Sequence, residues 1–403
     1  MNHTTELPMY LRRDGLDPAP ELGEARESAS VQRMVTVFGI PAYVVTRYAD
    51  VKIALADYER FSNRRPAWPG LLNSPPPPAS ADRQPEADTA GNLLATDPPD
   101  HTRLRRMLSP EFTMRRMNQL EPRVVEIVEQ HLDVMEDAGP PADLVAHFAL
   151  PVPSLVICEL LGVPYEDRDG FQRRSARQLD LALPMPERME LALQGRAYMR
   201  SLVERARRES GDDILGTLVR KYGNDVTDAE LTGMGALLLL AGHETTSNML
   251  ALGTLALLEH PEQLAAVRDT PDAVGPAIEE LLRYLSVVQT AIPRMTTTDV
   301  EIDGVTIPAG QLVLLSMPVG NRDPRFIESP QTLDIRRGEP GHLAFGHGVH
   351  HCLGAPLARM EMRIAYPALL RRFPRLRLAD DISEIQFKKT HFIYGVRSLG
   401  VTW

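Results

Sequence analysis

A segment near the C-terminal end of the chain places a cysteine among glycines and histidines. It reads Phe-Gly-His-Gly-Val-His-His-Cys over residues 345–352 and continues into Leu353 and Gly354. Helix-forming sequence follows at once, so Cys352 is predicted to lie at or just before a helix N-terminus, where unpaired N–H groups and the helix dipole favour a thiolate. A thiolate is a strong, electron-donating metal ligand, and the glycines would let the backbone approach a large, flat group.

Three other roles for this cysteine stay open on the residues alone. A lone cysteine is often a small buried hydrophobe. A nucleophile paired with His350 or His351 is a second alternative, although catalytic partners usually meet through the fold rather than along the chain. Zinc is a third, but only one cysteine joins the four histidines of this region, which are His342, His347, His350 and His351.

A long apolar helix is expected in the middle of the chain, over about residues 228–259. Thr227 and Glu230 form a capping-box pattern at its start, a hydroxyl followed three residues later by a carboxylate, and Pro261 stops it. About 32 residues at 1.5 Å per residue make ~48 Å. Such a helix must cross the whole molecule.

Polar residues interrupt this helix at its centre. Gly242, Glu244 and Thr245 stand where core residues are expected, in the run Ala-Gly-His-Glu-Thr-Thr over residues 241–246. The plain interpretation is a hydrogen-bonded polar patch on a buried helix. The functional interpretation is a local groove in which an acid and an alcohol relay protons into a dry site.

Two charge patterns elsewhere are ambiguous by themselves. Glu280 and Arg283 lie at i and i+3 of a predicted helix, which is ordinarily a surface ion pair. His101 and Arg105 lie at i and i+4 after a proline-containing helix start, which ordinarily makes a solvated basic face. Neither pattern identifies a site without further support.

Together, these patterns resemble the cytochrome P450 family. The phrase Phe-Gly-x-Gly-x-His-x-Cys-x-Gly over 345–354 is similar to the family's haem-thiolate loop, and Ala-Gly-x-Glu-Thr-Thr over 241–246 is similar to its oxygen-activation segment. Glu280-x-x-Arg283 with the later Arg337 resembles its structural Glu-x-x-Arg network, with Arg336 as an adjacent alternative partner. The resemblance implies a mainly α fold with small β-sheets, a single domain over residues 1–403 whose central helix crosses the molecule over a buried haem.

The resemblance also implies roles for individual residues. Cys352 would be the axial thiolate ligand to the iron of haem b. Gly242 would make room for dioxygen, Thr245 would hydrogen-bond it, and Glu244 would help to deliver protons. The cofactor contacts, which include donors to the haem propionates, would be His101, Arg105, Arg294, Phe345, His350, Cys352 and Gly354.

The implied reaction is monooxygenation, the insertion of one oxygen atom from O2 by hydroxylation or epoxidation. The implied substrate is a mid-sized hydrophobic molecule of the macrolide or polyketide, steroid or xenobiotic class. The proline-rich segment over about residues 65–95 is interpreted as a substrate loop, with a disordered linker as the alternative. Substrate contacts are expected at Leu94, Leu179, Leu237, Leu238, Ala241, Val288, Ala291, Ile292 and Ile393.

Composition restricts the partners and the compartment. A net charge of −10 disfavours nucleic-acid binding, and two cysteines far apart in sequence fit a reducing cytoplasm. The apolar run 234–258 carries Glu244 at its middle, so a buried helix is expected rather than a membrane span. The protein is expected to be a monomer. The sequence has no flavin or dinucleotide fingerprint, so electrons from NAD(P)H would arrive through a ferredoxin reductase and a ferredoxin. A candidate ferredoxin contact is the basic patch of Arg103, Arg106, Arg359 and Arg363.

Two other functions compete with monooxygenation. One is a peroxide-driven or radical-coupling haem enzyme of secondary metabolism, and the other is a non-enzymatic haem ligand carrier. The pairing of Glu244 with Thr245 favours the monooxygenase, because neither alternative needs a proton relay beside the haem.

Overall fold

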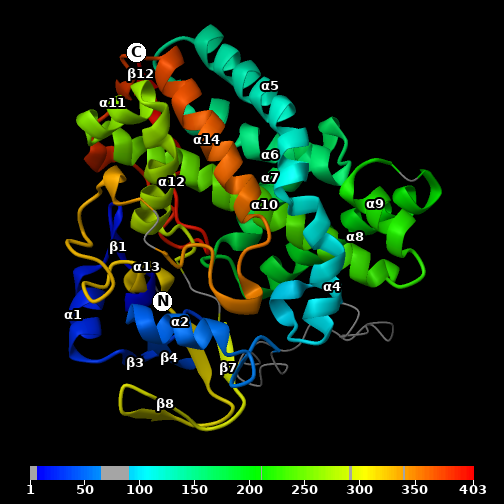
Figure 1. The fold of residues 1–403 in the computed structure, drawn as a ribbon, viewed down its shortest axis with the longest axis vertical. Coiled ribbons are helices and arrows are strands. Elements are labelled where there is room, and N and C mark those ends of the chain that lie inside the picture. Colours follow the sequence, from blue (N-terminus) through cyan, green and yellow to red (C-terminus); the bar gives the residue numbers. More distant parts are fainter. Residues whose placement is uncertain (1–6, 65–89, 210, 290–292, 339–340) are drawn as a thin grey trace.

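The computed structural model describes residues 7–64, 90–209, 211–289, 293–338 and 341–403. The greater part of the proline-rich segment, and the predicted substrate contacts Ala291 and Ile292, therefore lie outside the described residues. Helices form the larger part of the molecule. Most of the labelled strands lie around the N-terminal segment, and the last strand, β12 (Gly400–Thr402), lies at the other end of the molecule, beside the C-terminus (Figure 1).

The α-helices of the described residues run from Pro20 to Arg372. In chain order they are α1 (Pro20–Ser28), α2 (Tyr48–Ala56), α4 (Asp100–Leu108), α5 (Met114–Ala138), α6 (Pro151–Leu161), α7 (Arg168–Leu179), α8 (Met185–Glu209), α9 (Ile214–Tyr222), α10 (Asp228–Leu258), α11 (Pro261–Asp269), α12 (Pro271–Leu285), α13 (Met317–Gly320) and α14 (Ala355–Arg372).

The largest sheet has five strands in the order β3-β4-β10-β7-β5, with β10 parallel to β4 and the other pairs antiparallel. A separate antiparallel hairpin is formed by β8 and β9. The strands are β1 (Arg13–Asp14), β2 (Asp17–Pro18), β3 (Val31–Val35), β4 (Pro41–Val45), β5 (Phe61–Ser62), β6 (Ala142–Asp143), β7 (Pro293–Thr296), β8 (Val300–Ile302), β9 (Val305–Ile307), β10 (Leu312–Leu315), β11 (Arg377–Leu378) and β12 (Gly400–Thr402).

Helix α10 runs through the centre of the helical part and is buried along most of its length. It packs against α6, α8, α12 and α14, which explains why its sequence is apolar on all sides. The predicted capping box is confirmed: the Thr227 hydroxyl accepts from the backbone N–H of Glu230, and the Glu230 carboxylate accepts from the Thr227 N–H at 2.9 Å. The start of the helix is thus fixed by two reciprocal hydrogen bonds.

Prolines lie inside three helices, which local sequence rules do not anticipate. Helix α5 begins at Met114 and continues through Pro122, although the helical periodicity of the sequence is clear only over 124–135. A proline in a helix interior removes one backbone hydrogen bond and costs about 3 kcal/mol. The buried stripe of α5, which includes Met117 and Val124 on either side of the proline, packs against α14 and offsets that cost.

Glu361 on α14 is fully buried, and its Oε2 has no hydrogen-bond partner among the described residues. Burial raises the pKa of Glu361 well above its usual value. Because the folded state then holds a proton that the unfolded chain releases, the free energy of unfolding falls as pH rises from the unfolded pKa toward the folded one.

A Glu361→Gln variant is expected to lose this pH dependence and to be more stable than the parent at neutral pH. Each unit by which the folded pKa exceeds the unfolded one is worth about 1.4 kcal/mol. Urea unfolding of both proteins between mildly acidic and neutral pH measures the difference. Parallel stability curves would show that Glu361 ionises normally in the fold.

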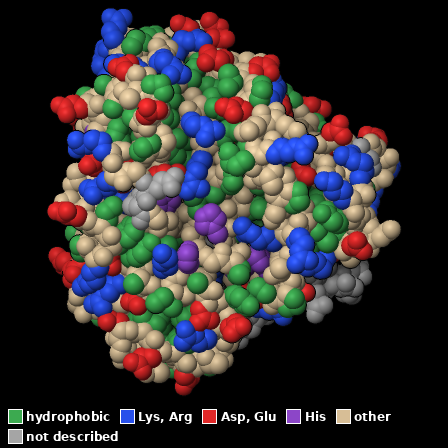
Figure 2. Space-filling model, viewed as in Figure 1, with side chains coloured by type: hydrophobic (Ala, Val, Ile, Leu, Met, Phe, Trp, Pro, Cys, Tyr) green, Lys and Arg blue, Asp and Glu red, His purple; other side chains and the backbone are tan. Residues whose placement is uncertain are grey.

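The surface mixes both signs of charge. Figure 2 shows acidic and basic side chains interspersed over one face, with histidines near its centre. In the part of the chain that the structure describes, no helix is both long and apolar enough to cross a bilayer.

Candidate active site

A cavity lies between the middle of α10, helix α4 and the loop that precedes α14. Its wall brings together residues that are far apart in sequence, and most of the predicted site residues are among them. The predicted residues that line it are Leu94, His101, Arg105, Leu237, Leu238, Ala241, Gly242, Thr245, Val288, Phe345, His350, Cys352 and Gly354.

The cysteine loop is closed by its own backbone and pressed against the N-terminal part of the molecule. The N–H of Cys352 donates to the carbonyl of Phe345 at 2.8 Å. Gly348 has a φ of +72°, and a Cβ there would lie 2.7 Å from the Cα of Ala56 at the end of α2. Only glycine meets both demands, so α2 packs directly on the loop.

Cys352 lies three residues before the first residue of α14, just before a helix N-terminus as predicted, and faces the cavity. Its side chain has accessible surface, but that surface belongs to the internal cavity and protein surrounds the residue on all sides. Burial raises the pKa of the Cys352 thiol. The backbone N–H groups of Gly354 and Ala355 and the guanidinium groups of Arg105 and Arg359 act in the opposite direction and favour a thiolate.

Nitrogen donors gather on one side of the cavity. The rings of His101 and His350 lie 4.1 Å apart between centroids, and Arg105 donates to the carbonyl of His351 at 2.6 Å. Both ring nitrogens of His101 are buried, and neither has a hydrogen-bond partner in the described ranges. A buried imidazole with two unsatisfied nitrogens is costly unless something in the cavity completes its bonding.

His350 is held in one orientation by residues that the motifs did not indicate. Its Nε2 lies 2.7 Å from the Nδ2 of Asn63, and Asn63 is anchored by Asp97. Burial, followed by the neighbouring His101 and Arg294, lowers the pKa of His350 to about 3, so the ring is neutral. Because the amide of Asn63 donates to Nε2, the ring proton lies on Nδ1 and Nδ1 is a donor.

The middle of α10 presents one face to the cavity. Thr245 lines it, and its hydroxyl donates to the carbonyl of Ala241 one turn earlier at 2.9 Å. Gly242 also lines it, and a Cβ there would lie 2.9 Å from the side chain of Ile157 on α6. The glycine therefore lets α10 and α6 approach each other in addition to leaving space in the cavity.

Glu244 is not beside Thr245 in the cavity wall, which corrects the prediction of an acid and an alcohol in one groove. Its carboxylate is buried on another side of α10, 3.6 Å from Nε2 of His243 and 3.4 Å from Nδ2 of Asn248. Burial alone would raise the pKa of Glu244, but His243, Lys388 and His391 outweigh it and lower that pKa to about 2. A proton can therefore pass from Glu244 to the cavity only if the Glu244 side chain rotates toward the cavity or a water molecule carries the proton between them.

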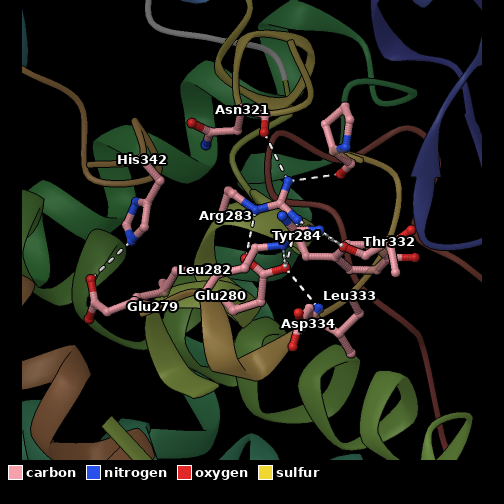
Figure 3. A network of polar contacts seen from close by, with 12 residues as sticks. Glu279, Glu280, Leu282, Arg283, Tyr284, Asn321, Thr332, Leu333, Asp334 and His342 are labelled. Carbon is pink, nitrogen blue, oxygen red and sulfur yellow. Dashed lines mark hydrogen bonds and ion pairs between the residues drawn. The ribbon is translucent and has the colours of Figure 1, made fainter. Parts of the chain in front are cut away.

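The Glu-x-x-Arg pair forms a buried network rather than a surface ion pair (Figure 3). Arg283 binds both carboxylate oxygens of Glu280, at 2.7 and 2.8 Å, and both side chains are fully buried. Arg337 joins Glu280 at 3.2 Å, whereas Arg336 is exposed and pairs with Asp334. Of the two arginines considered from sequence, Arg337 is the one in the network.

Comparison with known proteins agrees with this arrangement. A family model described as Cytochrome P450 matches residues 188–393. Over the full length of both chains, 47% of residues are identical to those of Cytochrome P450 FAS1 from Rhodococcoides fascians. The chain belongs to the cytochrome P450 family.

Solved P450 structures share its fold. P450 StaH from glycopeptide antibiotic A47934 biosynthesis is 41% identical, with a TM-score of 0.86 over 99% of this chain and 100% of that one. CYP105P1 in complex with filipin I is 38% identical, with a TM-score of 0.89 over 97% of each chain. The predicted fold class, family and enzyme class are thereby confirmed, and the protein is a P450 monooxygenase whose cofactor is haem with an axial cysteine thiolate.

The residues of the cavity fit a haem. A haem carries two propionates, and charge-assisted bonds from nitrogen donors are the usual way to hold carboxylates in a protein. His101, with its unsatisfied buried nitrogens, Arg105 and His350 supply such donors on one side, while the thiol of Cys352 faces the same space. When bound, the haem activates dioxygen and inserts one of its atoms into a substrate bond.

Several predicted contacts do not line the P450 cavity, and several lining residues were missed. In the described part of the chain, Leu179 and Ile393 are not in its wall, although Ile393 bridges to Val288. Arg294 is buried close to His350 without lining the cavity. Apolar lining residues on helices were missed, because in the sequence an apolar residue that lines a cavity cannot be told from one that packs in the core. The missed residues include Phe112, Ile157, Met249, Leu282 and Met362.

Thr245→Ala is expected to uncouple the P450 reaction. The Thr245 hydroxyl is one of two on α10 that line the cavity, the other being that of Thr246, and proton transfer by a positioned group contributes 10²-fold or more to such steps. We expect product formed per reductant consumed to fall by roughly tenfold or more, with hydrogen peroxide released instead. Thr245→Ser keeps a hydroxyl and serves as the control; equal coupling in all three proteins would refute the role.

Proposed function

We propose that this P450 inserts one oxygen atom from O2 into a mid-sized apolar molecule by hydroxylation or epoxidation, with Cys352 as the axial ligand. The observation that carries the proposal is the shared cavity: the thiol of Cys352, the nitrogen donors around His101 and the hydroxyl of Thr245 all face one space. Thiolate donation favours O–O bond cleavage, and the donors orient the cofactor.

An apolar substrate is supported by the rest of the cavity wall. Leu237, Leu238 and Ala241 on α10 and Val288 after α12 contribute aliphatic surface, and such linings bind hydrophobic ligands. The substrate is proposed to be of the macrolide or polyketide, steroid or xenobiotic class. Relatives with such different names as Pentalenic acid synthase and Nocardicin C N-oxygenase are 43% and 41% identical, so likeness alone does not select among these classes.

We further propose that electrons arrive from NAD(P)H through a ferredoxin reductase and a ferredoxin, and that the protein works as a cytoplasmic monomer. Of the basic patch expected to meet the ferredoxin, Arg103 is paired with Glu230, and Arg359 binds Glu279 at 2.6 and 2.7 Å. Arg106 and Arg363 are exposed, so the contact is proposed at these two residues of α4 and α14.

The test is turnover of the purified holoenzyme with NADPH, ferredoxin, ferredoxin reductase and isotopically labelled dioxygen. A panel of polyketides, steroids and drug-like apolar compounds is first screened for displacement of water from ferric haem. We expect a binding compound to give a product with one labelled oxygen atom. Product formed only with added peroxide would indicate a peroxide-driven or coupling enzyme, and binding without reductant consumption would indicate a ligand carrier.

A further inference from the structure

A second pocket lies beside the cavity, between α7, α8 and the first half of α10. It holds about 200 Å³, and Leu237 of α10 lines both spaces. Asn92 faces this pocket, while the next two residues, Leu93 and Leu94, face the cavity. The two spaces therefore share a wall made of one helix face and one short segment.

Two glycine contacts fix that shared wall. A Cβ on Gly233 of α10 would overlap the carbonyl oxygen of Ala90, and a Cβ on Gly91, where φ is +76°, would overlap the carbonyl of Glu230. The segment around residue 91 is thus pressed onto the first turns of α10. This close approach holds Asn92 on the pocket side and the two leucines on the cavity side.

Basic side chains contribute to the lining of the pocket. Among the described residues it contains two guanidinium groups, from Arg174 and Arg196, and no carboxylate. Neutral polar side chains from Asn92, Ser175 and Gln178 accompany them. Arg196 is steadied by the backbone carbonyls of Ala90 and Ala229, each at 3.5 Å.

Two other arginines of α7, Arg168 and Arg177, are paired with acids, whereas Arg174 is not paired with any acid in the described part of the chain. Arg168 pairs with Asp169 at 3.2 Å, and Arg177 pairs with Glu187. Arg174 is half-buried and lies 5.6 Å from the ring centroid of Tyr198, and within the described ranges its guanidinium has no hydrogen-bond or ion-pair partner.

The nearest acid does not satisfy this guanidinium. Asp167 accepts the hydroxyl of Tyr198 at 2.8 Å instead. Burial lowers the pKa of Arg174, with Tyr198 and Asp167 acting against it, which marks a cation that is partly stripped of water. A half-buried cation of this kind gains most from an anion that enters the pocket.

We propose that this pocket binds the carboxylate end of an elongated apolar substrate, whose remainder passes Leu237 into the cavity. The proposal rests on the proposed function, because the far end of the same molecule is the end that is oxidised. Gly233 and Leu237 of α10 line the pocket, and Thr245 of the same helix lines the cavity. Thr245 is twelve residues after Gly233 and eight residues after Leu237. At 1.5 Å per residue, the carboxylate and the oxidised carbon are ~12–18 Å apart.

The test uses decanoic, dodecanoic and tetradecanoic acids and their methyl esters as probes of the haem-loaded enzyme. Calorimetry and the optical spin-state shift each give dissociation constants for the parent, Arg174→Met and Arg173→Met. Arg173 lies on the same helix but is exposed and is not in the pocket wall, so it is the matched control. We expect at least one acid to bind the parent and the Arg173 variant about tenfold or more tightly than its ester, and Arg174→Met to lose that preference.

Equal binding of acid and ester by the parent, a preference retained in Arg174→Met, or no binding of any acid would each overturn the pocket assignment. The carbon monoxide spectrum of the same reduced samples separates this result from the proposed function. A thiolate spectrum without acid preference refutes only the pocket, whereas the absence of a thiolate spectrum refutes the assignment of Cys352. An unchanged thiolate spectrum in Arg174→Met also shows that the variant is folded.

Discussion

A Cys352→His variant will lose the thiolate signature of the reduced, carbon monoxide-bound enzyme and will lose monooxygenation. Cys352 is the thiol that faces the cavity, and backbone N–H groups of Gly354 and Ala355 stabilise its anion. Histidine offers a neutral nitrogen ligand that does not donate electron density as a thiolate does, so O–O cleavage loses its driving force. The expected loss of product formation is complete, and the optical spectrum measures the change of ligand directly.

The other cysteine of the chain provides the control. Cys158 is buried in α6, and burial raises the pKa of its thiol to about 12, so it is not a thiolate at working pH. Cys158→Ala should keep the spectrum and the activity of the parent, with only a modest loss of stability from the vacated volume. A carbon monoxide spectrum that is unchanged in Cys352→His would show that the ligand is another residue.

An Arg283→Met variant is expected to be less stable by about 3–5 kcal/mol, because removing one partner of a buried pair leaves an uncompensated charge on the other. Arg283 is fully buried, binds both oxygens of Glu280, and also donates to the carbonyls of Asn321 and Pro330. Its loss leaves these hydrogen-bond acceptors without their donor at the same time. Chemical unfolding gives the stability, and retention of haem during purification reports on the cysteine loop.

Arg336→Met is the matched control for this prediction. Arg336 is one residue from the network member Arg337, but it is exposed and, among the described residues, pairs with Asp334 alone. Exposed pairs contribute about 0–1 kcal/mol, so little change is expected. Replacing both Glu280 and Arg283, by glutamine and methionine, should recover part of the loss, since no unpaired charge then remains. Equal effects of Arg283→Met and Arg336→Met would contradict the structural role of the pair.

The sequence predicted the features of the P450 that depend on local chemistry. The capping box at Thr227 needs only two side chains and a backbone, and it is where the pattern indicated. The cavity face of α10 follows helical spacing, since Leu237, Ala241 and Thr245 recur every four residues. Predictions of this kind succeed because the information lies within a few turns of chain.

The rest depended on contacts between distant segments. Pro122 lies inside α5 because packing against α14 outweighs the proline penalty, and no local rule contains that contact. The support of His350 by Asn63 and Asp97 joins residues roughly 250–290 positions apart. The position of Glu244 was misjudged because sequence spacing does not show which neighbours of Thr245 share its side of the helix. The cavity face of α10 takes in Gly242 and Thr246, whereas the Glu244 carboxylate lies against His243 and Asn248.

Glu230 has a consequence for how the active site can move. Its carboxylate closes the first turn of α10 through Thr227 and also binds Arg103 on α4, the helix that carries His101 and Arg105. Helices α4 and α10, which both line the cavity, are therefore joined at one side chain. Because Arg103 is partly exposed, this link contributes about 0–1 kcal/mol, so it favours the observed spacing of the two helices without locking it.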